Sequence, residues 1–372
     1  MRIGVPREIK TDEYRVGLVP ATVQELVARG HSVEVEAGAG NGAGIGDADY
    51  VAAGATIALS PDQVFAHADL VVKVKEPLAA ERAQLRRGQV IFTYLHLAPD
   101  RAQVDDLVRS GVTAIAYETV TDATGRLPLL APMSKVAGRM APQVAAHALE
   151  RWHGGRGILL GAVDEVPPAR VVVLGGGEVG GAAVEVAVGM GAEVIVVARS
   201  HGTVDRLSRR FGGRISAVIA GKDAIAALCA SADVVIGAAL VAGASAPKLI
   251  TAQTVAAMKP GAVIVDVSID QGGCAETSQP TTHRQPTFVV DGVVHYCVAN
   301  MPGAVPRTST FALTHATQPY VLALADRGFP RALIDDAGLR AGLNVHDGRI
   351  TCRGVAEASG LAFVPATEVL GL

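Results

Sequence analysis

Residues 169–200 restrict the fold of this chain more than any other segment, because they predict a strand, a glycine-rich turn, a helix and a second strand in succession. Residues 169–174 form an apolar run typical of a buried parallel strand. The turn Gly175-Gly-Gly177-Glu-Val-Gly180 follows, with a helix predicted over 182–190 and a strand over 192–198. In such a unit the glycines allow a tight turn, a close approach of the backbone to a pyrophosphate, and packing of the helix on the strand. The segment therefore predicts a dinucleotide-binding α/β unit with the phosphates at the helix N-terminus.

The end of the second strand bears on which dinucleotide is bound. An NAD-binding unit usually has an acidic residue there, which hydrogen-bonds the ribose 2′-hydroxyl. This chain has Ala198-Arg199-Ser200 instead. A guanidinium and a hydroxyl suit a 2′-phosphate, so this feature favours NADP(H). The alternative is that Arg199 is a solvated surface residue, which leaves NAD(H) open as the cofactor.

Composition limits the partners and the compartment. The chain has 372 residues, enough for two domains, and 33 basic residues against 36 acidic ones give a net charge of −3. No basic field therefore predicts a nucleic acid or a membrane surface as partner. The four cysteines are widely spaced, with no metal-binding pattern, which predicts no metal and a reducing compartment. The first residues lack the apolar core of a signal peptide, so we expect a cytoplasmic protein without a membrane span.

Strands and helices are predicted to alternate along the chain, which indicates α/β architecture. The first 128 residues already contain enough of these elements for a complete α/β domain, and a long helix over 130–151 follows them. Strands are predicted at 2–6, 31–36, 69–75, 89–95 and 112–117, and further strands at 215–219, 233–237, 262–267 and 295–299. The chain returns to helix from residue 305 onward.

Four polar residues stand where ligands bind in such sheets, at the carboxyl ends of strands. Lys75, His96 and Asp270 are each predicted to end a strand, and Arg15 follows the first strand in a polar loop. Any one of them alone is more often a solvated or structural residue. Together they suit a small anionic substrate: Arg15 would pair with a carboxylate, Lys75 would hold a keto or imino group, and His96 would transfer a proton.

With these residues in place, the sequence resembles the alanine dehydrogenases, and more broadly the group that they form with the nucleotide-binding part of transhydrogenase. The resemblance covers essentially the whole chain. Its motifs include Pro6-Arg-Glu8, Lys73-Val-Lys75-Glu-Pro77, Phe92-Thr-Tyr-Leu-His96, Pro132-Met-Ser134, Asp270-Gln-Gly-Gly-Cys274 and Asn300-Met-Pro302.

The resemblance implies two Rossmann-like domains, with a dinucleotide-binding domain (129–306) inserted into a discontinuous substrate domain (1–128 and 307–372). It also implies reversible oxidative deamination of L-alanine to pyruvate and ammonia, and a homo-hexamer. Carried over by position, His96 and Asp270 are the catalytic pair. Arg15, Lys75, Glu118, Leu130, Met133 and Asn300 are the substrate-binding residues. The cofactor-binding residues are Ser134, Gly175, Gly177, Glu178, Val179, Gly180, Leu249, Ile269 and Met301, together with Ala198, Arg199 and Ser200.

Two positions depart from the family pattern. Ala198 replaces the expected acid, and Lys135 stands where we expect Glu, next to Ser134. We interpret Lys135 as one partner of a surface ion pair, with attraction of extra phosphate charge as the alternative.

Three other functions remain open at this point. The same scaffold could reduce an imine formed from a different oxo acid and amine. It could instead be a transhydrogenase component or a non-catalytic nucleotide-sensing module, although the full set of Arg15, Lys75, His96 and Asp270 argues against both.

Overall fold

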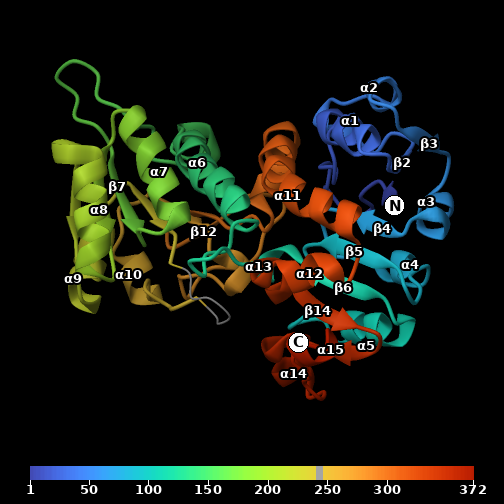
Figure 1. The fold of residues 1–372 in the computed structure, drawn as a ribbon. Coiled ribbons are helices and arrows are strands. Elements are labelled where there is room, and N and C mark those ends of the chain that lie inside the picture. The colour runs from blue at the N-terminus through green and yellow to red at the C-terminus, as the bar shows by residue number, and fades with distance from the viewer. Residues whose placement is uncertain (240–245) are drawn as a thin grey trace. The chain divides into compact units, whose positions relative to one another are not determined.

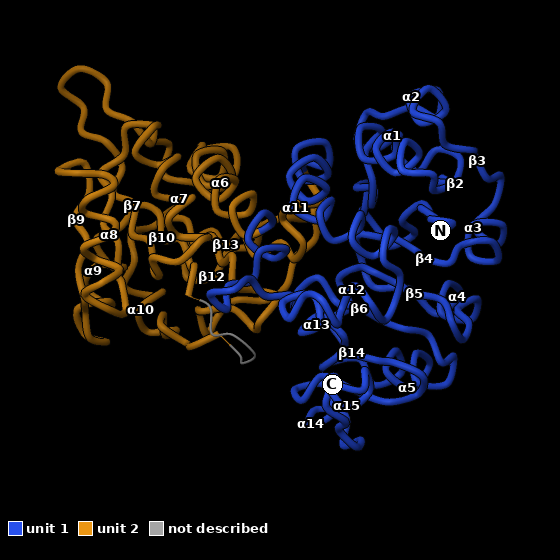
Figure 2. Tube along the Cα trace, viewed as in Figure 1, with its two compact units in different colours: residues 1–133, 305–372 blue, residues 134–304 orange. Residues whose placement is uncertain are grey.

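Strands from the two ends of the chain share one sheet, and strands from its middle form another (Figure 1). The computed structural model describes residues 1–239 and 246–372. Unit 1 comprises Met1–Met133 and Val305–Leu372, and unit 2 comprises Ser134–Ala304 (Figure 2). These unit boundaries lie at 133/134 and 304/305, whereas the domain boundaries expected from the sequence lie at 128/129 and 306/307.

The sheet of unit 1 has eight strands in the order β15-β14-β6-β5-β4-β1-β2-β3. The strands β1 to β6 are parallel, and β14 pairs antiparallel with β6. Their bounds are β1 (Arg2–Val5), β2 (Ser32–Glu36), β3 (Thr56–Ala58), β4 (Leu70–Val72), β5 (Val90–Thr93), β6 (Thr113–Ala116), β14 (Leu343–His346) and β15 (Arg349–Ile350). The chain runs outward from β1 to β3 and then returns to the other side of β1 with β4. The topological switch point is therefore between β1 and β4, where α/β sheets bind ligands.

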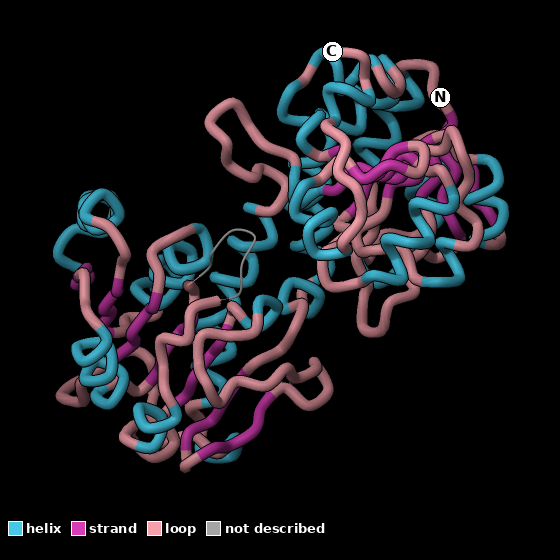
Figure 3. The backbone as a smooth tube through the Cα atoms, turned by 90° about the horizontal axis from the view of Figure 1, so that it is seen from below, coloured by secondary structure: helices cyan, strands magenta, loops and turns pink. Residues whose placement is uncertain are grey.

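The core of unit 1 joins both parts of its discontinuous chain. Val71 and Ile91 of the sheet pack with Leu107 from the first part and with Val345 and Val355 from the second. The helices of the unit are α1 (Pro20–Ala28), α2 (Asp47–Ala52), α3 (Pro61–His67), α4 (Ala79–Arg82), α5 (Arg101–Ser110), α11 (Pro306–Arg327), α12 (Arg331–Asp335), α13 (Ala337–Ala341), α14 (Arg353–Ser359) and α15 (Ala366–Val369). Figure 3 shows strands gathered inside each unit, with helices around them.

The sheet of unit 2 repeats this strand order around β7. Its seven strands follow the order β12-β13-β11-β10-β7-β8-β9, and all are parallel except β12. Their bounds are β7 (Arg170–Leu174), β8 (Glu193–Val197), β9 (Ile215–Val218), β10 (Val234–Gly237), β11 (Val263–Asp266), β12 (Thr287–Val290) and β13 (Val293–Tyr296). The switch point lies between β7 and β10, directly where the glycine-rich turn leaves β7.

On one face of the unit 2 sheet, alternate residues of the central strands line an apolar core. Val172 and Leu174 of β7 and Val235 of β10 pack with Ile225 and Cys229 from a helix. The helices of this unit are α7 (Glu178–Gly189), α8 (His201–Phe211), α9 (Lys222–Ser231) and α10 (Ala252–Ala256), and α6 (Ala131–Ala148) crosses the unit boundary. Two parallel sheets of this order confirm the predicted α/β fold class with two Rossmann-like folds.

The structure corrects several element boundaries. The strands predicted to end at Lys75, His96 and Asp270 end earlier, at Val72, Thr93 and Asp266. The helix predicted from residue 182 begins at Glu178, about one turn earlier, with Gly177 as its N-cap. Among the described residues, we find no helix that is both long and apolar enough to span a membrane.

Candidate active site

Three proposed substrate-site residues lie in loops that leave neighbouring strands of unit 1. Arg15 lies in the connection from β1 to α1, Lys75 follows β4, and His96 follows β5. The three strands are adjacent and parallel, so these loops leave the same edge of the sheet. The loops are also tied together, because Tyr94 donates from its backbone to Val74 O at 3.2 Å and Thr93 Oγ1 donates to Lys75 O at 2.8 Å.

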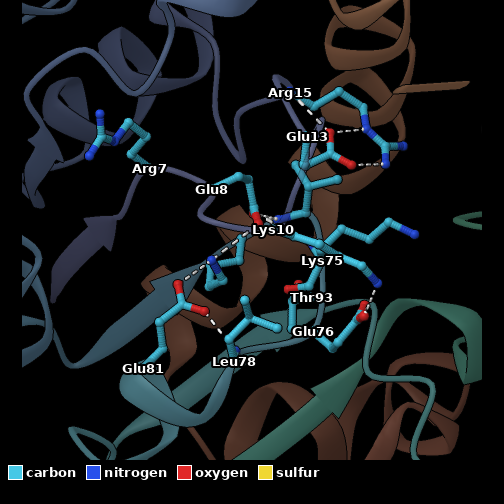
Figure 4. Close-up of polar contacts among 12 residues, drawn as sticks. Arg7, Glu8, Lys10, Glu13, Arg15, Lys75, Glu76, Leu78, Glu81 and Thr93 are labelled. Atoms are coloured by element: carbon cyan, nitrogen blue, oxygen red, sulfur yellow. Dashed lines mark hydrogen bonds and ion pairs between the residues drawn. The ribbon is translucent and has the colours of Figure 1, made fainter. Parts of the chain in front are cut away.

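Arg15 is almost fully buried, and Glu13 determines the direction of its guanidinium. Its Nε and Nη2 donate to the two carboxylate oxygens of Glu13 at 2.7 and 2.5 Å, as Figure 4 shows. Its Nη1 lies 3.1 Å from Met133 Sδ. Burial lowers the pKa of Arg15, but the bonds to Glu13 outweigh that effect and the pKa is raised. The guanidinium is therefore a permanent cation, fixed in orientation by a bidentate pair.

A buried ion network holds the backbone from which Lys75 extends. Lys73 is fully buried, and its Nζ donates to Glu81 at 2.6 Å and to Glu8 at 3.2 Å. Glu8 Oε1 also accepts from the backbone N–H groups of Val74 at 2.7 Å and Lys75 at 3.2 Å. These two N–H groups bond to a carboxylate instead of to a neighbouring strand, and β4 therefore ends before Lys75.

Lys75 itself has a different environment from Lys73. Its side chain is half-buried, and its Nζ has no hydrogen bond or ion pair with another described residue. Burial and the nearby Arg15 guanidinium lower its pKa. The lysine is therefore poised to interact with a polar group that enters the site.

His96 has an unusual backbone conformation, with φ at +47°. Few residues with a β-carbon adopt this left-handed region, so the surrounding contacts must maintain it. Glu118, in the short helix η2 (Tyr117–Thr119) after β6, accepts from His96 N at 2.6 Å and from Leu95 N at 3.1 Å. The imidazole is exposed and stacks on the Tyr94 ring, with centroids 5.8 Å apart and 9° between planes. Tyr94 is held in turn by its hydroxyl, which donates to Leu129 O at 2.6 Å.

In unit 2, the glycines of the turn after β7 have the separate roles expected from the sequence. Gly175 has φ at +113°, which favours glycine. A Cβ at Gly180 would overlap the carbonyl oxygen of Gly175, so the start of α7 packs tightly on the turn. A Cβ at Gly177 would meet no atom within 4 Å. The space beside Gly177 is therefore open at the N-terminus of α7, a position that suits a phosphate group.

The helix α6 places Ser134 beside this turn. Gly138, one turn along α6 from Ser134, approaches α7 so closely that a Cβ there would overlap Val179 O. Lys135 forms an ion pair with Glu178 at 3.8 Å, and both side chains are more than half exposed. This geometry agrees with our interpretation of Lys135 as one partner of a surface pair.

The residues proposed to contact the adenosine ribose follow β8. Ala198 is buried, and Arg199 and Ser200 are exposed. Ser200 caps α8, because its Oγ accepts from Thr203 N at 3.4 Å. Arg206 of α8 reaches back to the turn and donates to Gly176 O at 2.5 Å.

Asp270 lies beyond β11 in the short helix η5 (Ile269–Gln271). Its carboxylate is exposed and makes no hydrogen bond or ion pair with another described residue. The loop that carries it is held by the fully buried Asp266, which accepts from Ser268 N at 3.1 Å and from Cys274 N at 2.7 Å. These bonds to a side chain replace strand pairing, and β11 therefore ends at Asp266.

The remaining proposed residues are distributed over both units. Met133 contacts Arg15, and Leu130 lies half-buried just before α6. Leu249 donates from its backbone to Cys274 O at 2.8 Å, and Ile269 is buried in η5. Asn300 has φ at +62° and precedes the buried Met301 of η6 (Met301–Ala304).

The sequence did not predict which carboxylates hold these loops in place. Glu13 binds the guanidinium of Arg15, Glu8 accepts from the backbone N–H of Lys75, and Asp266 accepts from the backbone N–H of Ser268, next to Ile269. Glu8 and Asp266 lie at or near the ends of predicted strands, and that position was the available signal.

Metal-type ligands gather at one place in the described part of the chain. His147, Glu150 and His153 are exposed near the end of α6, with Glu150 oxygens 3.6 Å from His147 Nδ1 and 3.7 Å from His153 Nε2. These contacts are ion pairs when the imidazoles are protonated.

Comparisons with known proteins agree over both halves of the chain. The N-terminal domain of the alanine dehydrogenase/PNT family matches residues 4–137, and its C-terminal domain matches residues 141–353. Alanine dehydrogenase from Halomonas elongata is 57% identical over 371 residues, and that from Mycobacterium tuberculosis is 52% identical over 370, each match covering 100% of both chains.

Solved structures show the same relationship. An L-alanine dehydrogenase is 50% identical, with a TM-score of 0.94 over 96% of this chain and 99% of that one. The transhydrogenase of Sinorhizobium meliloti, at 24% identity, has a TM-score of 0.83 over 94% of this chain and 100% of that one, a likeness of fold alone.

Proposed function

This chain belongs to the alanine dehydrogenase/PNT family, and from that premise we propose that it catalyses the reversible NAD(P)-dependent oxidative deamination of L-alanine to pyruvate and ammonia. The observation that carries the proposal is the convergence of Arg15, Lys75 and His96 on one edge of the unit 1 sheet. A fixed cation, a half-buried amine and an exposed imidazole are the groups that a small 2-oxo acid needs for binding, polarisation and proton transfer.

Arg15 and Lys75 would bind the substrate. Two nitrogens of Arg15 are held by Glu13, and its Nη1 lies against Met133 Sδ, a weak acceptor that a substrate carboxylate can replace. Lys75 would donate to the oxo group and polarise it. Holding the carboxylate and the oxo group at two points fixes the orientation of C2, which lowers the entropic cost of the reaction.

His96 would transfer the protons that accompany addition of ammonia and loss of water. Its exposed ring is oriented by Tyr94, and the backbone below it is fixed by Glu118. We retain Asp270 as the second proposed catalytic residue. Its exposed carboxylate suits stabilisation of the cationic iminium that forms from pyruvate and ammonia.

The dinucleotide would be held by Ser134, by the turn Gly175 to Gly180, and by Leu249, Ile269 and Met301. The open space at Gly177 and the N–H groups of α7 fit its pyrophosphate. When bound, the nicotinamide supplies or accepts the hydride at C2 of the substrate.

The choice between NADP(H) and NAD(H) would depend on Arg199. Its side chain is exposed next to Ala198, which replaces the acid that would repel a 2′-phosphate. Ser200 is engaged as the cap of α8, so the favourable contact would come mainly from the guanidinium. We therefore propose that the enzyme accepts NADPH.

We also propose a cytoplasmic homo-oligomer, hexameric by resemblance to its family. Light scattering on the purified protein in solution measures the mass of the assembly and checks this proposal.

The test of function is the initial rate of reductive amination by the purified full chain. With pyruvate and ammonium we expect turnover with NADH and with NADPH at matched concentrations, and Arg199→Ala should lower the NADPH rate selectively. His96→Ala should lower kcat about 100-fold or more and leave the NADH Kd within about twofold. His67→Ala, at an exposed histidine paired with Glu34, is the matched control and should keep full activity. Absence of turnover with both dinucleotides would contradict the proposed reaction.

A further inference from the structure

The residue that holds His96 in place is Glu118, whose carboxylate is occupied by backbone N–H groups. The carboxylate accepts from His96 N at 2.6 Å, and both of its oxygens accept from Leu95 N, at 3.1 and 3.2 Å. The family resemblance implies that Glu118 binds the substrate. From these contacts we propose instead that Glu118 is a positioning residue: it fixes His96 for proton transfer and does not itself bind the substrate. This inference rests on the function proposed above.

His96 has a left-handed backbone conformation. Its φ of +47° is strained for a residue with a β-carbon, so it persists only where neighbouring groups impose it. Two successive N–H groups that point to one acceptor are the backbone arrangement that binds an anion. Glu118 supplies this anion from within the chain. The hydrogen bonds to its carboxylate therefore account for the strained backbone of His96.

The Glu118 carboxylate and its two N–H partners follow the ends of neighbouring strands. Glu118 lies two residues beyond the end of β6, and Leu95 and His96 lie just beyond the end of β5. These two strands are adjacent and parallel, with Thr93 paired with Ala116. The sheet thus brings the carboxylate and the N–H pair together without any bound ligand.

The same arrangement of a carboxylate and two successive N–H groups recurs at Lys75. Glu8 Oε1 accepts from two successive N–H groups, those of Val74 and Lys75, just beyond β4. Glu8 also pairs with the buried Lys73, so its substitution would disturb an ion network as well as the loop. Glu118 has no ion pair with another described residue, and this makes it the cleaner site for a test.

Two sets of contacts determine the position of the His96 side chain. The Glu118 bonds fix the backbone from which the imidazole leaves, and stacking on Tyr94 fixes its plane. Loss of the carboxylate would let residues 95 and 96 relax toward extended backbone, which moves the ring away from its present position. A displacement of about 1 Å can lower a rate about 100-fold.

The experiment compares Glu118→Gln with the wild type in the pyruvate and ammonium assay. We expect kcat to fall about 10- to 100-fold, because the amide loses the charge and presents a donor to the two N–H groups. The KM for pyruvate and the NADH Kd should stay within about twofold. Asp122→Asn is the matched control, because Asp122 likewise accepts from two backbone N–H groups, those of Thr124 at 2.8 Å and Arg126 at 3.0 Å, and bonds to neither Leu95 nor His96. It should keep kcat within about twofold.

A double-mutant cycle separates positioning from direct catalysis. If Glu118 acts through His96, adding Glu118→Gln to His96→Ala should not lower the residual rate further. A further loss in that background would show that Glu118 acts on the substrate, and would overturn the proposal. A rise in the KM for pyruvate with unchanged kcat would overturn it as well.

Amide hydrogen exchange tests the hydrogen bonds from Leu95 N and His96 N to Glu118 independently of activity. In folded Glu118→Gln the amides of residues 95 and 96 should exchange faster than in the wild type, whereas those of the β5 interior should not change. Unchanged exchange at residues 95 and 96 would contradict the proposal that Glu118 fixes their backbone. A wild-type chain inactive with pyruvate would instead contradict the proposed function, so the two failures are distinguishable.

Discussion

At the scale of single residues, the candidate substrate site contains one cation whose charge is compensated by a neighbouring carboxylate and one whose charged form is disfavoured by its surroundings. Arg15 is buried against Glu13, which compensates its charge. Lys75 is half-buried beside Arg15, and the charged form of its side chain is disfavoured by burial and by that neighbour. Such an arrangement favours ligand binding at the expense of stability in the ligand-free protein.

We therefore predict that Lys75→Gln loses activity and gains stability. The folded-state pKa of Lys75 lies below its ordinary value of 10.5, so the wild type bears its full penalty at pH values below that lowered pKa. The penalty shrinks as the pH rises through the folded-state pKa and is absent above 10.5. Denaturant unfolding without ligands should thus show a more stable Lys75→Gln at pH 7 and a smaller difference near pH 10.

The control for this prediction is Lys135→Gln, at a lysine whose side chain is 60% exposed. An exposed pair contributes about 0–1 kcal/mol, so little change in the free energy of unfolding is expected. A Lys75→Gln protein less stable than the wild type at pH 7 would mean that Lys75 is compensated in the folded state.

Residue chemistry also shows how far the sequence could predict the candidate site. Arg15, Lys75 and His96 carry their chemistry in their own side chains, and the structure places all three in loops at one edge of a sheet. The anchors Glu8 and Glu118 function through backbone N–H groups of another loop. Their partners become neighbours only when parallel strands end together, so single-sequence patterns contain little information about them.

At the scale of elements, apolar runs predicted the central strands well and their ends poorly. The runs at Val171–Leu174 and Ile91–Thr93 lie within β7 and β5. The predicted strands overran their true ends at Lys75, His96 and Asp270, because N–H groups beyond those ends bond to Glu8, Glu118 and Asp266 instead of to a strand. A hydrophobic pattern contains no information about which group accepts a hydrogen bond from a backbone N–H.

The turn between β7 and α7 allows a sharper prediction, because two of its glycines have different surroundings. Gly180→Ala would place a Cβ on the Gly175 carbonyl and should destabilise unit 2 by about 1–3 kcal/mol. Gly177→Ala meets no atom within 4 Å and has φ at −76°, so the melting temperature should not change. Its methyl group would instead occupy the space proposed for the pyrophosphate. We expect NADH fluorescence titration to show a weaker Kd for Gly177→Ala, and binding equal to wild type would refute that placement.

At the scale of the whole molecule, unit 1 depends on both ends of the chain. The strand β14 covers the edge of β6 through the pairs Leu343–Ile115 and Val345–Ala114. The buried residues Val345, Ile350 and Val355 complete the core built by the first part of the unit. The first 128 residues, which looked complete by element count, therefore lack part of their core and one sheet neighbour.

This dependence predicts the outcome of two truncations at the C-terminus. Removing residues 343–372 exposes the β6 edge and deletes several buried side chains that each contribute about 1.5–3 kcal/mol, a loss comparable with the whole stability of about 5–15 kcal/mol. We expect this variant to aggregate or to lack a cooperative thermal transition. Removing only residues 366–372 deletes α15, which contains no buried residue, and should leave both the transition and the pyruvate assay intact. If the longer truncation folded as the wild type does, the apolar contacts made by β14, β15 and α14 would be dispensable, and the core of unit 1 would lie entirely within its first segment.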